Sequence, residues 1–249
     1  MVFGFGRKGS GKSQPPAGPL DGRQWIIDRL APTDQPGSME QANARGLKLF
    51  DDAYSVMKNE RGVRIEDMAA MLGSVGGYLC LTAVLDRLKE TGQAPQDIGM
   101  TVLRGHDGHI YYFGDAPNWL LCEAPYSLVS LLFGAASQHG APVSIEMLHD
   151  EMRLVAQRAG KPDFLDLDLP QEHRVDSPIN WARQFAPMVV QSVMGGMAPA
   201  VRLPIVIGFA LQQAVDVGRQ SLDPMMITRI ALQCAARAAK LDPARVMVA

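Results

Sequence analysis

The amino-acid sequence predicts a mainly α protein: a compact domain of about seven to nine helices with one small β-hairpin at about residues 101–114. Apolar residues recur at helical spacing through most of the chain, and the period changes to two around Asp107-Gly108. The first residues are instead rich in Gly and Pro and hold basic residues without acids. We therefore assign residues 1–20 to a disordered basic tail and 21–249 to one helical domain, with residues 21–37 as an arm that docks on it.

Composition narrows the class of protein. A chain of 249 residues, 47% of them hydrophobic, can bury a stable core without disulfides or structural metal ions. The net charge is −2, and the tail holds three basic residues and no acid, so the remainder carries −5. A body of that charge is not a bulk nucleic-acid binder, and we expect no nucleic-acid partner.

The cysteines and the N-terminus indicate a cytoplasmic protein. The three cysteines are far apart, lie in apolar stretches and have no basic neighbour to activate a thiol, so we expect reduced core residues. Glycines and charges interrupt the N-terminus too early for a secretory signal. The cysteines are Cys80, Cys122 and Cys234.

One motif near the N-terminus matches the phosphate-binding pattern G-x-x-x-x-G-K-[ST], at residues 6–13, GRKGSGKS. A working P-loop follows a buried strand and opens a helix. Only five residues precede the motif, and Pro15 and Pro16 oppose a helix after it. Nucleotide binding is therefore the weakest of the functions considered.

The arm and the first long helix follow the tail. Trp25 and Ile26 are expected to dock the arm on the body. From Ser38, a candidate N-cap, to Gly62, a candidate stop, the spacing predicts an amphipathic surface helix. Its expected apolar face is Leu47, Phe50, Tyr54 and Met57.

The next helix, at about residues 65–90, contains 18 uncharged residues in a row, from Met68 to Leu85. That length is at the lower limit of a membrane span. Gly73 and Gly77 form a G-x-x-x-G pattern that lets another backbone approach closely. Because small and polar residues dilute the run and no basic cluster flanks it, we expect a buried core helix and no transmembrane span.

The hairpin is predicted from the alternating segment around Asp107-Gly108, a favoured pair for a two-residue type I′ turn. That register places Val102 opposite Phe113 and His106 opposite His109. An isolated hairpin is marginal, so we expect it to lie on helices or to pair across a dimer interface.

The rest of the chain is predicted to be helical. Short pieces are expected at 116–123 and 128–136, and Ser144 should cap a helix that ends at Gly160. Helices at 179–194 and 203–218 precede a last one that begins at Asp223-Pro224. The expected buried face of this last helix is Ile227, Ile230, Cys234, Ala238 and Leu241.

The best candidate binding residues are at the hairpin tip: Arg104, His106, Asp107 and His109. If the two imidazoles face each other they offer two ligands of one metal, which is half a site, and no further ligand motif is found. An exposed polar tip explains them more simply, so we expect no metal and no cofactor. The acidic loop with Asp163, Asp166 and Asp168 lacks EF-hand spacing and is expected to be a solvated loop or a docking strip for a partner.

Two functions of different class remain. The first is a non-enzymatic helical interaction or scaffold protein that buries its apolar helices in a homo-oligomer, because three helices are apolar nearly all round. The alternative is a small-ligand-binding protein or enzyme with a pocket between the hairpin and the Gly-rich helix. In that alternative the polar groups would come from Arg104, His106, His109 or Asp115.

Overall fold

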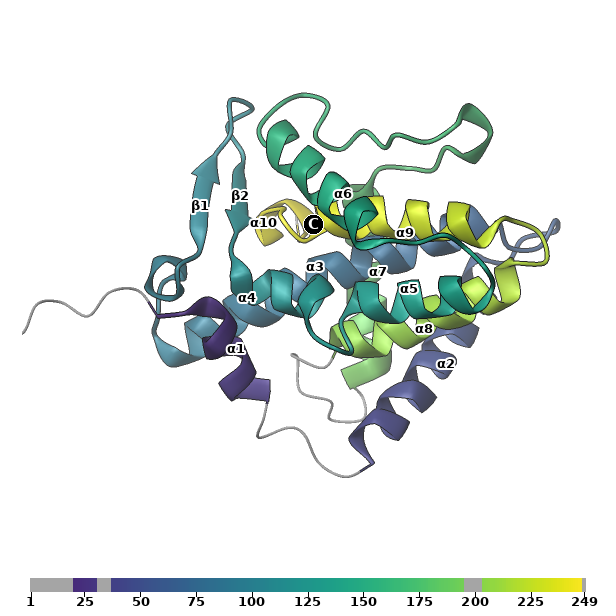
Figure 1. Ribbon diagram of the computed structural model, residues 1–249, viewed down its shortest axis with the longest axis horizontal. Coiled ribbons are helices and arrows are strands. Elements are labelled where there is room, and N and C mark those ends of the chain that lie inside the picture. Colours follow the sequence, from purple (N-terminus) through teal and green to yellow (C-terminus); the bar gives the residue numbers. More distant parts are fainter. Residues whose placement is uncertain (1–19, 31–36, 195–202, 248–249) are drawn as a thin grey trace, which may run out of the picture.

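The fold is mainly α with one two-stranded antiparallel hairpin, as the sequence predicts (Figure 1). The computed structural model describes residues 20–30, 37–194 and 203–247. Short helical turns, η2 to η4, lie at 95–98, 119–123 and 171–173. The main elements are α1 (Gly22–Leu30), α2 (Ser38–Met57), α3 (Ile65–Thr91), β1 (Thr101–Arg104), β2 (Ile110–Phe113), α4 (Asp115–Asn118), α5 (Leu128–Gln138), α6 (Ile145–Arg158), α7 (Pro178–Met194), α8 (Leu203–Gly218), α9 (Pro224–Ala238) and α10 (Pro243–Val246).

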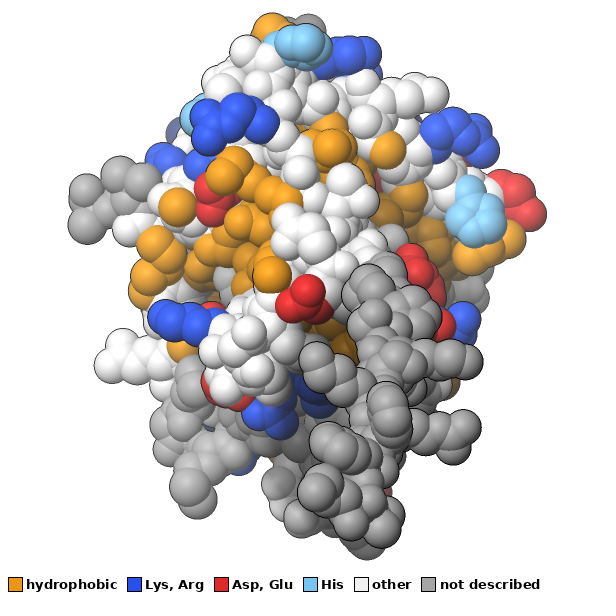
Figure 2. All heavy atoms as spheres, turned by 90° about the vertical axis from the view of Figure 1, so that its left-hand side faces the viewer, with side chains coloured by type: hydrophobic (Ala, Val, Ile, Leu, Met, Phe, Trp, Pro, Cys, Tyr) orange, Lys and Arg blue, Asp and Glu red, His pale blue; other side chains and the backbone are white. Residues whose placement is uncertain are grey.

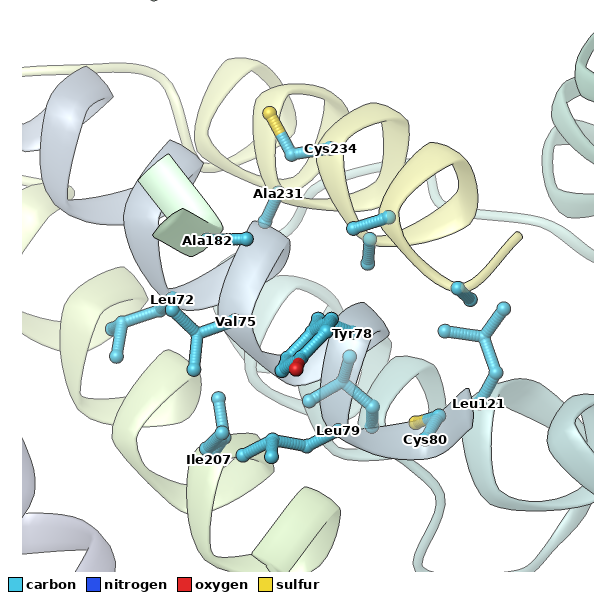
Figure 3. Close-up of a cluster of buried hydrophobic side chains, with 14 of the residues drawn as sticks. Leu72, Val75, Tyr78, Leu79, Cys80, Leu121, Ala182, Ile207, Ala231 and Cys234 are labelled. Carbon is cyan, nitrogen blue, oxygen red and sulfur yellow. The ribbon is translucent and has the colours of Figure 1, made fainter. Parts of the chain in front are cut away.

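Helix α3 runs through the middle of the molecule and packs on α7, α8 and α9. Two helical stretches, Ile65–Thr91 and Asp115–Gln138, are long and apolar enough to cross a membrane by length and composition alone. Within α3, however, 89% of the apolar window is buried by the rest of the chain. Figure 3 shows the side chains of Leu72, Val75 and Tyr78 surrounded by residues from neighbouring helices. This degree of burial is what a core helix requires.

The closest packing in the core is between α3 and α9. A Cβ atom on Gly73 would lie 2.4 Å from the carbonyl oxygen of Ala231, and one on Gly77 would lie 2.1 Å from that of Ala235. Real Cβ atoms do not approach oxygen so closely, so only glycine fits at both positions. The G-x-x-x-G pattern therefore brings two backbones together within one subunit.

Helix α1 packs on the body through the two residues that the sequence singles out. Trp25 and Ile26 of α1 are buried, and the Trp25 indole N–H donates to Gln93 Oε1 at 2.9 Å. The Arg29 guanidinium lies 3.9 Å from the centre of the Trp25 ring. These contacts attach α1 to the end of α3. The motif at 6–13 and the rest of the predicted tail up to residue 19 lie outside the described residues.

Two details predicted for α2 are wrong. The helix begins at Ser38 with Gly37 as its N-cap, and it ends at Met57, while Gly62 closes a separate tight turn with Asn59. The buried face is also rotated. Phe50 is buried as expected, but Leu47 and Tyr54 are exposed, and the helix packs on α8 through small residues such as Gly46.

The caps of the later helices agree with the sequence. The Ser144 side chain accepts from the N–H of Met147 at the start of α6, and Asp223 accepts from that of Met225 at the start of α9. The predicted buried face of α9 is confirmed, with Ile227, Ile230 and Cys234 fully buried. Because α9 is enclosed nearly all round, its polar residues are buried too.

The hairpin lies against the segment that joins α9 to α10. The N–H of Tyr112 donates to the carbonyl oxygen of Lys240 at 3.0 Å, and Tyr111 forms a β-bridge with Leu241. The Tyr111 ring also packs edge-on against Phe164 at 4.7 Å between centroids. The chain after α9 therefore supports β2 as a third strand would.

A pair of glycine substitutions tests the α3–α9 packing. We expect Gly77→Ala to lower the free energy of unfolding by about 1–3 kcal/mol, because the added methyl group meets the Ala235 carbonyl and the helices must separate. Urea denaturation of the purified variant measures the change.

Gly134→Ala is the matched control. Gly134 lies inside α5, where a Cβ atom would meet nothing within 4 Å. Alanine there should raise the free energy of unfolding by up to about 1 kcal/mol, since it favours the helix. Equal changes in the free energy of unfolding for the two substitutions would contradict the close approach of the α3 and α9 backbones.

Candidate functional site

The four residues singled out in the sequence, Arg104, His106, Asp107 and His109, lie at the exposed tip of the hairpin. Asp107 organises the turn: its carboxylate accepts from the N–H of His109 at 3.0 Å and from the Tyr111 hydroxyl at 2.5 Å. Partial desolvation opposes ionisation, but these hydrogen bonds outweigh it and lower the pKa of Asp107. Arg104 and Asp107 thus stabilise the turn itself.

The predicted hairpin register is wrong by one residue. Val102 pairs with Tyr112, and the Gly105 N–H donates to the His109 carbonyl at 2.8 Å. The turn therefore contains three residues, 106–108, and closes with Gly108 at a φ of 79°. Such a turn needs a positive φ at its glycine, whereas a type I′ turn would need one at Asp107 as well.

His106 and His109 are consequently not opposite each other, because His109 pairs with Gly105. The tip also docks on the end of α6, where the Asp107 N–H donates to the Gly160 carbonyl at 3.3 Å. Over the described ranges, no group of three or more His, Cys, Asp or Glu residues is placed to hold a metal ion. A ligand role for the four tip residues stays a prediction.

A pocket of about 570 Å³ lies at the other end of the hairpin, between β2, α3, α7 and α10. The sequence alternative of a pocket between the hairpin and the Gly-rich helix matches this location, but Tyr112 lines it in place of the tip residues. Most of the lining is apolar, with Ala83 and Leu85 on one wall and Val190 on another. Figure 2 shows hydrophobic side chains gathered on the side of the molecule where the hairpin lies.

The polar groups of the pocket are two carboxylates, two tyrosine hydroxyls, one threonine hydroxyl and one amine. Burial, and then the charge of Asp86, raise the pKa of Tyr78, while burial and the charge of Asp242 raise that of Tyr112. Partial desolvation also raises the pKa of Asp86, although Lys89 opposes this. Each carboxylate therefore lies near a tyrosine, and the pocket carries an excess of negative charge.

Lys240 lies behind the hairpin and is fully buried. Its amine donates to Asn118 Oδ1 at 2.6 Å and lies 5.5 Å from the centre of the Phe113 ring. Desolvation lowers the pKa of Lys240 to about 8, against the opposing influence of Cys122 and Cys80. The amine therefore connects α4 and β2 to the segment after α9. The backbone of the same residue also contacts β2, since the Tyr112 N–H donates to the Lys240 carbonyl.

All three cysteines are shielded thiols, and Cys80 and Cys122 lie near this amine. Burial raises the pKa of Cys80, that of Cys122 to about 11 and that of Cys234 to about 12. All three are free of disulfides. Thiols with such raised pKa values are poor nucleophiles at neutral pH.

A second buried polar group is Arg237, which is fully enclosed on α9. Its guanidinium pairs with Glu151 of α6 and donates to the Asp166 carbonyl oxygen at 3.1 Å and to that of Gln233 at 3.0 Å. The pair therefore holds α6 and the loop after it on α9. Removing one partner would leave an uncompensated buried charge.

The burial of Lys240 and the residues that line the pocket were not predicted. Lys240 lies two residues after the end of α9 at Ala238, where basic residues usually reach solvent, so its burial left no sequence signal. Comparison with known protein families, with curated proteins and with solved structures gives no match for this chain. The site must therefore be interpreted from its own geometry.

The pH dependence of stability tests the burial of Lys240. Below pH 8 the amine is protonated in both states; between pH 8 and 10.5 only the unfolded chain keeps the proton, so rising pH favours the folded state. Over that window the Lys240 contribution to the free energy of unfolding should rise by about 3 kcal/mol. The buried thiols lower the free energy of unfolding as pH rises, because the unfolded chain loses their protons first. Measurements on wild type alone therefore do not isolate the Lys240 contribution.

The comparison is between wild type and Lys240→Met, measured by urea denaturation at pH 7.5, 9 and 10.5. The thiols are common to both proteins, so their contribution cancels in the comparison. The free energy of unfolding of wild type should therefore rise relative to that of Lys240→Met as pH rises. A difference that stays constant across the window would show that the amine is not desolvated in the folded protein.

Proposed function

We propose that this protein is a binding protein that holds a small amphipathic ligand, with an apolar body and a positively charged amine, in the pocket between β2, α3, α7 and α10. The observation that carries the proposal is the pocket of about 570 Å³ with a mostly apolar lining and two carboxylates. Sites for small molecules have this size and this combination of an apolar wall with few polar groups.

The apolar walls of the pocket are the evidence for a ligand with an apolar body. Leu79 and Ala83 come from α3, Val190 comes from α7, and Pro243 begins α10. These elements belong to one hydrophobic cluster, so the walls are fixed by core packing. A pocket with packed walls binds without a large ordering cost.

The carboxylates of Asp86 and Asp242 are the evidence for a ligand with a positively charged end. Asp86 makes no hydrogen bond or ion pair with any residue in the described part of the chain, and Lys89 is the one cationic residue that lines the pocket there. The Asp86 side chain is exposed, and the partial desolvation that remains disfavours its charge and raises its pKa. A ligand amine would offset that penalty, and the Tyr78 and Tyr112 rings also favour a cation.

The two other functions stay predictions. Self-association was inferred from three helices apolar nearly all round: a single chain encloses α3 and α8 among its own helices, whereas only 50% of the apolar window in Asp115–Gln138 is buried. Nucleotide binding at residues 6–13 concerns residues outside the described structure. The geometry therefore favours the ligand pocket.

Filling the pocket tests its location. We expect wild type to bind the fluorescent apolar probe N-phenyl-1-naphthylamine, and Val190→Trp to weaken binding by about tenfold or more, because the indole occupies the space of the probe. The control is Val217→Trp, since Val217 is exposed on α8. Similar probe affinity in the two variants would place the bound probe elsewhere.

The charge of the ligand is tested by competition with the bound probe. Each competitor is used below its critical micelle concentration. Dodecylamine should displace the probe at lower concentration than dodecanoate, because the carboxylates attract the amine and repel the acid. In Asp86→Asn this preference should decrease while probe affinity stays unchanged. Equal competition in wild type would reject the amine and leave the pocket itself intact as a proposal.

A further inference from the structure

The N-terminal segment of the chain has the two chemical properties that the proposed ligand needs. Residues 1–5 are apolar apart from one glycine and include Phe3 and Phe5, and Arg7 and Lys8 follow shortly after them. An apolar group next to a positive charge is what the pocket between β2, α3, α7 and α10 favours. The chain therefore carries an occupant for this pocket in its own sequence.

The described chain begins at the end of α3 that contributes to the pocket wall. The Leu20 N–H donates to the Asp97 carbonyl oxygen at 2.6 Å, and Asp97 lies in η2, which follows α3. The connection between α3 and η2 folds back on the helix, because the Gln93 N–H donates to the Leu88 carbonyl oxygen at 2.9 Å. Leu88 directly precedes Lys89, which lines the pocket. The attachment point of the N-terminal segment is therefore on the same end of α3 as the pocket.

The chain before this attachment point is long enough to bring the phenylalanines to the pocket. Residues 1–19 lie outside the described structure. Of these, residues 9–19 alone can span up to about 35–40 Å when extended. A tether of this kind gives the attached segment an effective concentration on the order of millimolar at the pocket. Modest intrinsic affinity is consequently enough for the segment to fill the pocket for much of the time.

Charge also favours this occupant. Residues 1–20 hold three basic residues and no acid, whereas the remainder of the chain carries −5. The exposed Asp86 carboxylate lines the pocket, and exposed ion pairs contribute little affinity, so the basic residues direct the segment to this face. Most of the affinity comes from burial of the aromatic rings against the apolar walls.

We propose that Phe3 and Phe5 occupy the ligand pocket, with Arg7 and Lys8 beside its carboxylates, and that the ligand must displace them in order to bind. This inference rests on the proposed function, because it gives the same pocket a competing occupant within the chain. The segment lowers the apparent affinity for the ligand according to the fraction of molecules in which it fills the pocket.

Probe binding to the full chain measures this competition. In Phe3→Ser/Phe5→Ser the affinity for N-phenyl-1-naphthylamine should be about threefold or more higher than in wild type, because the segment no longer fills the pocket. Ser10→Ala/Ser13→Ala is the matched control, since it alters the same segment without removing an apolar group. Its affinity for the probe should equal that of wild type.

The outcomes separate this inference from the proposed function. Equal probe affinity in wild type and Phe3→Ser/Phe5→Ser overturns the inference and leaves the pocket as a ligand site. Absence of probe binding in both proteins rejects the proposed function, and the inference with it. An equal gain of affinity in the control variant also overturns the inference, because the effect would then not depend on the phenylalanine rings.

A photo-crosslinking experiment on the full chain tests where the segment lies. The substitution Phe5→p-benzoylphenylalanine should give crosslinks within one chain to pocket residues such as Leu79 and Val190, identified by mass spectrometry of the digested protein. Dodecylamine below its critical micelle concentration should lower the yield of these crosslinks, because it competes for the same space. Crosslinks only to other surfaces or between two chains, or no crosslinks at all, would overturn the inference.

Discussion

The contact between the backbones of α3 and α9 is the constraint on which the rest of the structure depends. Gly73 and Gly77 bring α3 against Ala231 and Ala235, so the C-terminal end of α9 has a fixed position beside the second half of α3. The chain that leaves α9 there supports β2 and begins α10. The wall of the ligand pocket therefore follows from a packing contact that takes no part in binding itself.

Polar groups on the enclosed face of α9 determine where the non-helical segments lie. Gln233 and Arg237 bind the backbone of the acidic loop, and Lys240 binds Asn118 behind the hairpin. Such groups are costly to bury unless every partner is present, so they select one arrangement of loop and hairpin. The acidic loop, and the hairpin that borders the ligand pocket, are consequently placed by side chains of α9 and of the turn that follows it.

Much of the fold could be predicted from the sequence, because helix periodicity, the Ser144 and Asp223 caps and the Asp-Gly turn are local signals. The hairpin register was wrong because a three-residue turn that docks on Gly160 competes with the two-residue turn, and that contact is not local. The pocket and the buried Lys240 arise from tertiary packing. A lysine near a helix end has the same sequence pattern whether it is buried or exposed.

Native-state hydrogen exchange over a series of low urea concentrations tests the central claim most directly. If the α3–α9 contact is the constraint, the amides of Leu72 to Leu81 and of Ala231 to Ala238 exchange together, at the free energy of global unfolding. Exchange of the α9 amides at a clearly lower free energy than those of α3 would contradict it, because α9 would then open while α3 stays folded.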